Sequence, residues 1–214
     1  MKRIAFYGGS FDPVHNGHMA VARAVTEHFK LDQFVFIPAF HAPHKSRLKP
    51  TSAYDRYAML CLVTQNESRL SVSKIEFELP EKPFSVETLS RLIEEFAEDE
   101  LFFVMGADSW MDITTWREWE KVLSMTNHIV MTRPGVEIDT SHVTNEIRSR
   151  IIDLRSSAIG VPPLGDKHIY LCDFVNIDIS ATEVRRRSRL GDLSWRSHVA
   201  NEVAIYIEKY QIYN

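Results

Sequence analysis

The segment from Arg3 to His18 reads Arg-Ile-Ala-Phe-Tyr-Gly-Gly-Ser-Phe-Asp-Pro-Val-His-Asn-Gly-His. It opens with a continuous apolar run of strand length that leads into Gly8-Gly9, and glycines tolerate backbone angles that other residues resist. From about Asn16, apolar residues recur at helical spacing as far as Phe29. The segment therefore predicts a buried strand, a glycine turn and a helix whose N-terminus lies beside that turn.

A helix N-terminus in this position is suited to bind phosphate, because its unpaired N–H groups carry partial positive charge. His15 and His18 are three residues apart and can share one face there. Two imidazole donors would help to align and neutralise a polyphosphate. We interpret Asp12, which precedes Pro13, as a turn residue. The alternative is an ordinary strand–turn–helix with two surface histidines. The chain contains no Gly-x-x-x-x-Gly-Lys-Ser/Thr loop, and Gly8-Gly9 lacks the third glycine of a dinucleotide-binding motif.

The composition limits the classes of protein. The chain has 214 residues, of which 44% are hydrophobic, enough for one core, and we interpret residues 1–214 as a single domain. A formal net charge of −4 favours neither nucleic acid nor a membrane as a partner. Cys61 and Cys172 lie in separate apolar runs, as reduced thiols do, and no apolar run reaches membrane-spanning length. We expect a cytoplasmic location, and the sequence leaves open whether the chain forms a homo-oligomer.

Predicted strands alternate with predicted helices along the chain. After the first pair, strands are expected at 33–38, 70–79, 101–105, 128–132 and 169–174, and helices at 54–63, 85–96, 110–123, 141–155, 181–190 and 193–210. This alternation predicts an α/β fold with a doubly wound, mostly parallel sheet. In such sheets, ligands bind at the carboxyl ends of the strands. The motifs described here all follow predicted strands, so we expect them at one rim.

A second motif, Ile179-Ser-Ala-Thr-Glu-Val-Arg185, lies at a predicted helix start. Ser180 with Glu183 fits a capping box, which would explain that pair by structure alone. Arg185 has no such structural explanation. Hydroxyl groups at a helix N-terminus, with a guanidinium one turn later, form a clamp for terminal phosphates.

The loop predicted after the second strand contains His41, His44 and Lys45. Histidines can bind a metal ion, but no carboxylate or cysteine falls at ligand spacing, so we predict no protein-held metal. A lysine on a flexible loop better suits a second, anionic substrate.

The opening motif resembles the signature of the nucleotidylyltransferase superfamily, whose His-x-Gly-His element holds the phosphates of a nucleoside triphosphate. The second motif resembles its Ile-Ser-Ser/Thr-Thr-x-x-Arg element, with Ala181 in place of the middle hydroxyl. Residues 42–45, Ala-Pro-His-Lys, resemble the Pro-Pro-His-Lys loop of nicotinate-nucleotide adenylyltransferases. Further blocks resemble the same family at 82–89, 106–108, 114–119 and 133–135, whereas 136–166 carry no recognisable motif.

This resemblance implies a Rossmann-like nucleotidylyltransferase fold and the transfer of AMP from ATP to nicotinate mononucleotide. It implies magnesium bound mainly through the ATP phosphates and water. The implied catalytic residues are His15, His18 and Arg185. The implied ATP-binding residues are Gly8, Gly9, Ser10, Phe11, His15, Gly17, His18, Gly106, Asp108, Ile179, Ser180, Thr182 and Arg185. The implied acceptor-binding residues are Ser10, His44, Lys45, Thr88, Trp116, Arg117 and Arg133.

Two alternatives remain at this point. One is a sister adenylyltransferase that acts on nicotinamide mononucleotide or phosphopantetheine. The other is a non-catalytic nucleotide-binding sensor. His15, His18 and Arg185 argue against the sensor, because binding alone would not require a clamp at both ends of the triphosphate. The sequence also leaves open whether Arg117 adds charge to the acceptor pocket or points to solvent.

Overall fold

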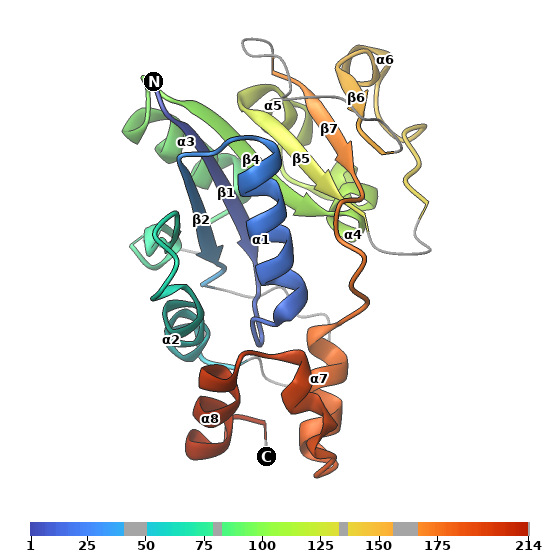
Figure 1. The fold of residues 1–214 in the computed structure, drawn as a ribbon. Helices are drawn as coiled ribbons and strands as arrows, with labels where there is room; N and C mark the ends of the chain where they lie inside the picture. The colour runs from blue at the N-terminus through green and yellow to red at the C-terminus, as the bar shows by residue number, and fades with distance from the viewer. Residues whose placement is uncertain (41–50, 79–82, 133–136, 156–166, 214) are drawn as a thin grey trace.

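The computed structural model describes residues 1–40, 51–78, 83–132, 137–155 and 167–213. Its centre is a seven-stranded sheet in the order β3-β2-β1-β4-β5-β7-β6 (Figure 1). Every neighbouring pair is parallel, which confirms the expected α/β class and extends the prediction of a mostly parallel sheet. The strands are β1 Arg3–Gly9, β2 Gln33–Pro38, β3 Leu70–Val72, β4 Glu100–Gly106, β5 Asn127–Met131, β6 Ile151–Asp153 and β7 Ile169–Cys172.

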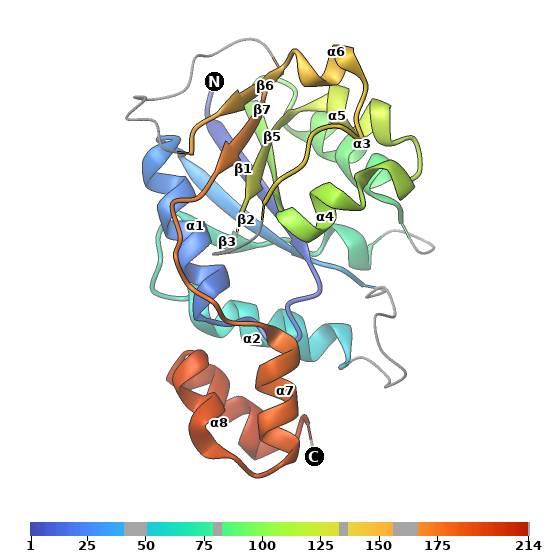
Figure 2. The same cartoon turned by 90° about the vertical axis from the view of Figure 1, so that its right-hand side faces the viewer.

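Helices cover both faces of the sheet (Figures 1 and 2). The apolar side chains of α1, α2, α7 and α8 belong to one core cluster, and those of α3, α4, α5 and α6 belong to another. The helices are α1 Asn16–His28, α2 Ala53–Thr64, α3 Ser85–Glu95, α4 Ala107–Met111, α5 Trp119–Met125, α6 Asn145–Arg148, α7 Ala181–Arg189 and α8 Asn201–Tyr210, with 3₁₀ turns at Ile75–Phe77, Ile113–Thr115 and Leu193–His198. Within the described residues, no helix is long and apolar enough to cross a bilayer.

β1 lies at the point where the chain changes direction across the sheet. Its neighbours are β2 on one side and β4 on the other, so the connections from β1 and β4 leave the sheet toward opposite sides. Such a switch point in a parallel sheet opens a crevice at the carboxyl ends of the strands. α7 and α8 lie beyond the carboxyl ends of the central strands, close to the start of α1 (Figure 1).

The long strand predicted at 70–79 is wrong. β3 ends at Val72 and is followed by the 3₁₀ turn at Ile75–Phe77. Ser73 explains the break, because its hydroxyl accepts a hydrogen bond from the main-chain N–H of Ile75 at 3.1 Å. Serine can offer the backbone a local partner that competes with a sheet ladder.

Three predicted helices also differ from the structure. Residues 107–125 form α4, a 3₁₀ turn and α5, because Trp116 is extended and Glu118 adopts a left-handed φ of 52°. In the segment predicted as a helix at 141–155, α6 makes one turn and β6 then pairs with β7 at the edge of the sheet. The helix predicted at 193–210 is a 3₁₀ turn followed by α8, since the backbone is extended at Val199 and Ala200.

Candidate active site

The segment between β1 and α1 is held by aromatic packing. The ring of Phe11 is buried and lies edge-on to Tyr7 and His18, at centroid distances of 5.3 and 5.0 Å. A Cβ added to Gly9 would come within 2.9 Å of the Phe11 ring, so only glycine fits there. This corrects the expected glycine turn: Gly8 and Gly9 continue β1, and the positive φ of this segment belongs to Phe11, at 48°.

His15 and His18 lie together at the start of α1. Their rings stack with centroids 3.6 Å apart, which confirms that the two side chains share a face. The main-chain N–H of His15 donates to Nδ1 of His18 at 3.2 Å. In the neutral ring of His18, the proton is therefore on Nε2, because Nδ1 acts as an acceptor. His18 thus offers a donor on the far side of its ring.

The chain just before the second motif lies against the first motif. Cγ2 of Ile177 would lie 3.8 Å from a Cβ added to Gly17, and the His15 ring would lie 3.1 Å from it. Ser180 caps α7, because its hydroxyl accepts from the N–H of Glu183 at 3.2 Å. The neighbouring Ile179 packs against the core cluster that contains α1. The N-termini of α1 and α7 therefore lie on the same side of the molecule.

Arg185 connects the two motifs directly. Its Nη1 donates to the main-chain carbonyl oxygen of Asp12 at 2.5 Å, and its Nη2 donates to the hydroxyl of Thr182 at 3.2 Å. These contacts engage two of the five N–H groups of a guanidinium. The following arginines are arranged differently: Arg186 and Arg187 donate to Glu183 and lower the pKa of its carboxyl to about 2.

Sequence reasoning missed Arg56, which is 1% exposed. Its guanidinium donates to the carbonyl oxygens of Ser10 and Ala39 at 2.6 Å each, and to that of Thr51 at 3.2 Å. It thereby ties the loop after β1 to the loop after β2. An arginine in an amphipathic helix carries no sequence signal for this role, although burial of a charged residue normally requires partners of this kind.

Asp12 was interpreted as a turn residue, and the structure places it in the turn before α1. Its carboxylate has a further partner that sequence reasoning missed. Tyr213 donates its hydroxyl hydrogen to Oδ1 of Asp12 at 2.7 Å, and the N–H of Thr51 lies 3.4 Å from Oδ2. Asp12 is only 7% exposed. Its carboxylate is therefore held by the protein itself.

The remaining described candidates lie after β4 and on α3. Gly106 caps α4, and the exposed Asp108 is in its first turn. The ring of Trp116 lies edge-on to Phe103 at 6.5 Å. Thr88 is 2% exposed, and its hydroxyl lies 3.4 Å from the carboxylate of the half-buried Glu76. Burial raises the pKa of Glu76.

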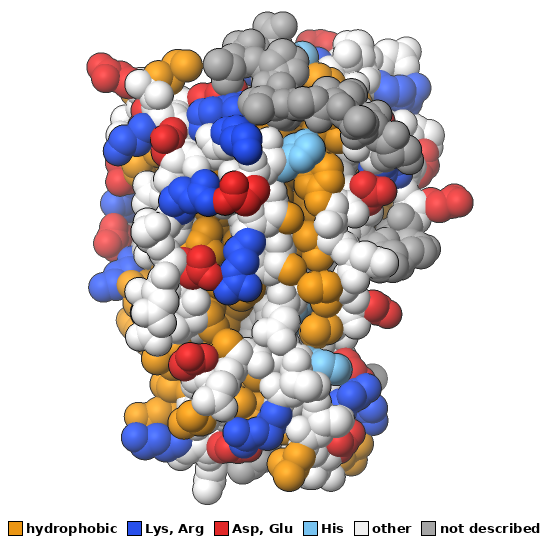
Figure 3. All heavy atoms as spheres, in the orientation of Figure 1, with side chains coloured by type: hydrophobic (Ala, Val, Ile, Leu, Met, Phe, Trp, Pro, Cys, Tyr) orange, Lys and Arg blue, Asp and Glu red, His pale blue; other side chains and the backbone are white. Residues whose placement is uncertain are grey.

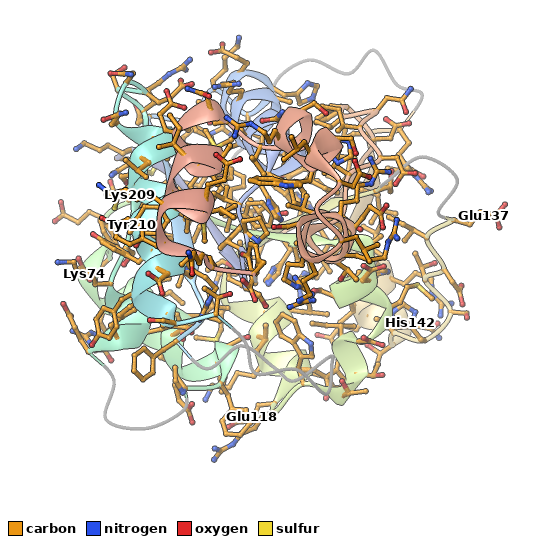
Figure 4. The ribbon with its side chains drawn as sticks, turned by 90° about the horizontal axis from the view of Figure 1, so that it is seen from below. Lys74, Glu118, Glu137, His142, Lys209 and Tyr210 are labelled. Carbon is orange, nitrogen blue, oxygen red and sulfur yellow. The ribbon has the colours of Figure 1, made fainter. Side chains whose placement is uncertain are left out.

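The side chain of Arg117 contacts α3 and the residue that precedes it. Its Nη1 donates to Glu87 at 3.2 Å, and its guanidinium lies 5.0 Å from the ring centre of Phe84. The side chain is 54% exposed. Seen from below, the neighbouring Glu118 projects outward, away from α7 and α8 (Figure 4). In this structure Arg117 therefore lies on the surface, paired with α3.

Comparison with known proteins places this site in a family. The model of the cytidylyltransferase-like family matches residues 6–187. A probable nicotinate-nucleotide adenylyltransferase of Thermus thermophilus is 34% identical over 211 residues, which cover 99% of each chain. The protein of the same name in Corynebacterium jeikeium is 32% identical and covers 96% of this chain and 98% of its own. The chain belongs to the nicotinate-nucleotide adenylyltransferases.

A solved structure supports the fold of this adenylyltransferase. The nicotinic acid mononucleotide adenylyltransferase of Plasmodium falciparum, complexed with NaAD, matches with a TM-score of 0.75 at 22% identity, covering 100% of this chain and 98% of its own. The Rossmann-like nucleotidylyltransferase fold expected from the sequence is thereby confirmed. Three predicted acceptor-binding residues of this adenylyltransferase, His44, Lys45 and Arg133, lie outside the described residues, as does His41.

The described part of the adenylyltransferase site consists mostly of donors. The stacked histidines, the α1 and α7 N-termini and the guanidinium of Arg185 come from segments more than 160 residues apart. On the face shown in Figure 3, basic and acidic side chains are interspersed. Such a local set of donors is suited to stabilise negative charge on a phosphate chain.

Proposed function

We propose that this adenylyltransferase transfers AMP from ATP to nicotinate mononucleotide and releases deamido-NAD and pyrophosphate. The observation that carries the proposal is the contact of Arg185 with Asp12, which brings the two phosphate-binding motifs of the chain into one site. The names of the relatives, which match along almost the whole chain, support the choice of acceptor.

The reaction requires alignment more than proton removal. The phosphate of nicotinate mononucleotide is an anionic nucleophile near pH 7, because the second pKa of a phosphate monoester is about 6. It attacks the α-phosphorus of ATP. The bond from that phosphorus to the oxygen that bridges the α- and β-phosphates breaks, and this oxygen leaves with pyrophosphate. His15 and His18 would donate to the phosphate chain as charge moves onto it. Arg185, with Ser180 and Thr182, would hold the departing pyrophosphate.

Magnesium would be held by the ATP phosphates and water, and would neutralise part of their charge. The donor set of the site fits this arrangement, because histidine and arginine N–H groups bind phosphate oxygens rather than a hard cation. The carboxylate of Asp12 is occupied by Tyr213 and Thr51. The described residues include no group of three or more His, Cys, Asp or Glu side chains that could hold a metal ion.

We also propose a cytoplasmic location for the enzyme. Cys61 and Cys172 are both free thiols in the structure, as in proteins of a reducing compartment. Whether the chain self-associates can be measured by light scattering on the purified protein.

Pyrophosphate release tests the proposed function. Purified protein is incubated with ATP, magnesium and one of three acceptors: nicotinate mononucleotide, nicotinamide mononucleotide or phosphopantetheine. We expect kcat/KM to favour the nicotinate acceptor over the nicotinamide acceptor by about a hundredfold, a ratio that a polar pocket can achieve. CTP in place of ATP serves as a nucleotide control. A ratio near one would indicate a dual-specificity enzyme, and ATP binding without turnover of any acceptor would indicate a sensor.

A further inference from the structure

The C-terminal end of the chain contacts the phosphate-binding segment. Tyr213 lies after α8 and is 2% exposed, and its hydroxyl donates to Oδ1 of Asp12 at 2.7 Å. Burial, together with the nearby carboxylate, raises the pKa of Tyr213 well above its usual value. The hydroxyl therefore remains protonated near neutral pH and acts as a hydrogen-bond donor there.

Asp12 is bonded to both Tyr213 and Arg185. The carboxylate of Asp12 accepts from Tyr213, while the carbonyl oxygen of the same residue accepts from Nη1 of Arg185 at 2.5 Å. The position of the carbonyl depends on the orientation of the whole Asp12 residue. Tyr213 thus stabilises the acceptor that the guanidinium of Arg185 uses.

The neighbours of Asp12 are held by other partners. The carbonyl of Ser10, two residues earlier, accepts from Arg56, and His15, three residues later, caps α1. Between these points, the hydrogen bonds that the structure describes for the Asp12 carboxylate are those with Tyr213 and Thr51, and the Thr51 bond is long, at 3.4 Å. Loss of the Tyr213 hydroxyl would therefore remove the shorter of the two.

We propose that Tyr213 is a positioning residue for adenylyl transfer, which acts through Asp12 to place the guanidinium of Arg185 against the leaving pyrophosphate. The inference rests on the proposed function for its reaction, but its structural part concerns ATP binding alone. Tyr213 does not touch the reacting atoms. Its effect is on the alignment of a charged donor, where a displacement of about 1 Å can lower a rate by about a hundredfold.

The chain provides a matched control in Tyr206. This residue lies on α8, and its hydroxyl donates to Oδ1 of Asp55 on α2 at 2.8 Å. Both tyrosines thus join the C-terminal segment to an aspartate by a bond of similar length. Only the bond of Tyr213 reaches the segment that carries the histidine pair. Tyr206→Phe therefore reproduces the loss of a tyrosine–aspartate bond without disturbing Asp12.

The first experiment compares Tyr213→Phe with Tyr206→Phe. We expect Tyr213→Phe to lower kcat by about tenfold and to weaken ATP binding, measured by calorimetry without acceptor, by about fivefold, because the clamp is less well aligned. KM for the acceptor should change less than twofold. Tyr206→Phe should alter each value less than twofold, and the Tm of both variants is recorded to compare their stability. Equal losses in the two variants, or an unchanged Tyr213→Phe, would overturn the proposal.

A second experiment tests whether Tyr213 acts through Arg185. Tyr213→Phe is introduced into wild type and into Arg185→Ala, and kcat and ATP affinity are measured in all four proteins. We expect the effect of Tyr213→Phe to fall below twofold once Arg185 is absent. A purely structural role would lower both backgrounds by the same factor, and that result would overturn the proposal. Absence of turnover in wild type would instead count against the proposed function, and the calorimetric comparison would still test Tyr213.

Discussion

Arg185 on α7 and Asp12 before α1 are 173 residues apart in sequence, and the guanidinium of one donates to the main-chain carbonyl of the other at 2.5 Å. The contact uses the main-chain carbonyl of Asp12, so it depends on the course of the chain at that point, where the Asp12 carboxylate is bonded to Tyr213. The bond to the Asp12 carbonyl therefore orients the other N–H groups of the Arg185 guanidinium. This arrangement leads to the first prediction.

Arg185→Ala should chiefly weaken the handling of ATP and pyrophosphate, because a clamp on the leaving group acts whichever acceptor is used. We expect kcat/KM for ATP to fall by about a hundredfold, the loss of one strong charge-stabilising donor. Arg185→Lys should recover only part of this, since an ammonium cannot reproduce two oriented N–H bonds. Steady-state kinetics in both directions measure the effect.

Arg189→Ala is the control for Arg185→Ala. Arg189 lies one turn later on α7 and is exposed, so its removal should leave kcat/KM within about twofold. If Arg189→Ala matched Arg185→Ala, the general charge of α7 would account for the loss. A loss of acceptor affinity with ATP affinity unchanged would place Arg185 at the opposite end of the reaction.

His18→Asn should separate catalysis from helix capping. The amide oxygen of asparagine can accept the N–H of His15 in place of Nδ1, but the side chain has no donor where Nε2 lies. We expect kcat to fall by about a hundred- to a thousandfold, with a stability close to that of wild type. His18→Ala should show the same loss of kcat and an additional destabilisation of about 1 kcal/mol. A kcat within about threefold of wild type in folded His18→Asn would remove Nε2 from the mechanism.

Arg56→Met should destabilise the fold strongly. The substitution keeps an apolar side chain of similar length but leaves the part-buried carbonyls of Ser10 and Ala39 without their donor. We expect a loss of about 3–5 kcal/mol in the free energy of unfolding, measured by urea denaturation. Arg69→Met, which removes an exposed ion pair with Glu27, should cost less than about 1 kcal/mol. Similar costs for the two variants would show that Arg56 contributes no more than a surface pair.

The sequence predicts the local part of the site well. The apolar run of β1, the helical spacing of α1 and the capping serine of α7 each depend on residues a few positions apart, and all three are confirmed. The shared rim follows from one general rule about parallel sheets. Assignments of individual ATP- and acceptor-binding residues remain predictions, because they concern ligands.

The sequence does not predict contacts that join distant segments. Tyr213 reaches Asp12 across 201 residues, and Arg56 reaches Ser10 across 46, and neither pair leaves a periodic pattern. The misassigned segments fail for a related reason. β6 becomes a strand because β7 offers it an edge, with Ile151 beside Ile169, although the local sequence favours helix. Glu118 adopts a left-handed backbone at the start of α5, and a glutamate does not predict this conformation as a glycine or asparagine would.

His128 should make the stability of the fold depend on pH. Its ring is completely buried, with Nδ1 3.1 Å from the carbonyl oxygen of Thr126, and burial lowers its pKa to about 3. In the unfolded chain the pKa of a histidine is about 6.5. Between these two values the unfolded chain binds more protons than the folded one, so stability falls as the pH is lowered from about 6.5 toward 3, by up to about 1.4 kcal/mol per pH unit.

His128→Asn tests this dependence. The asparagine amide can still donate to the carbonyl of Thr126 but does not titrate, so the variant should lack the contribution of this residue. Urea denaturation at pH 8.5, 8, 7, 6, 5 and 4.5 gives the free energy of unfolding of both proteins, and the contributions of the other titrating groups cancel in the difference. We expect wild type to lose stability more steeply than His128→Asn below pH 6.5, with a constant offset above pH 7.5. Parallel curves over the whole range would mean that His128 takes up a proton in the folded state as readily as in the unfolded chain.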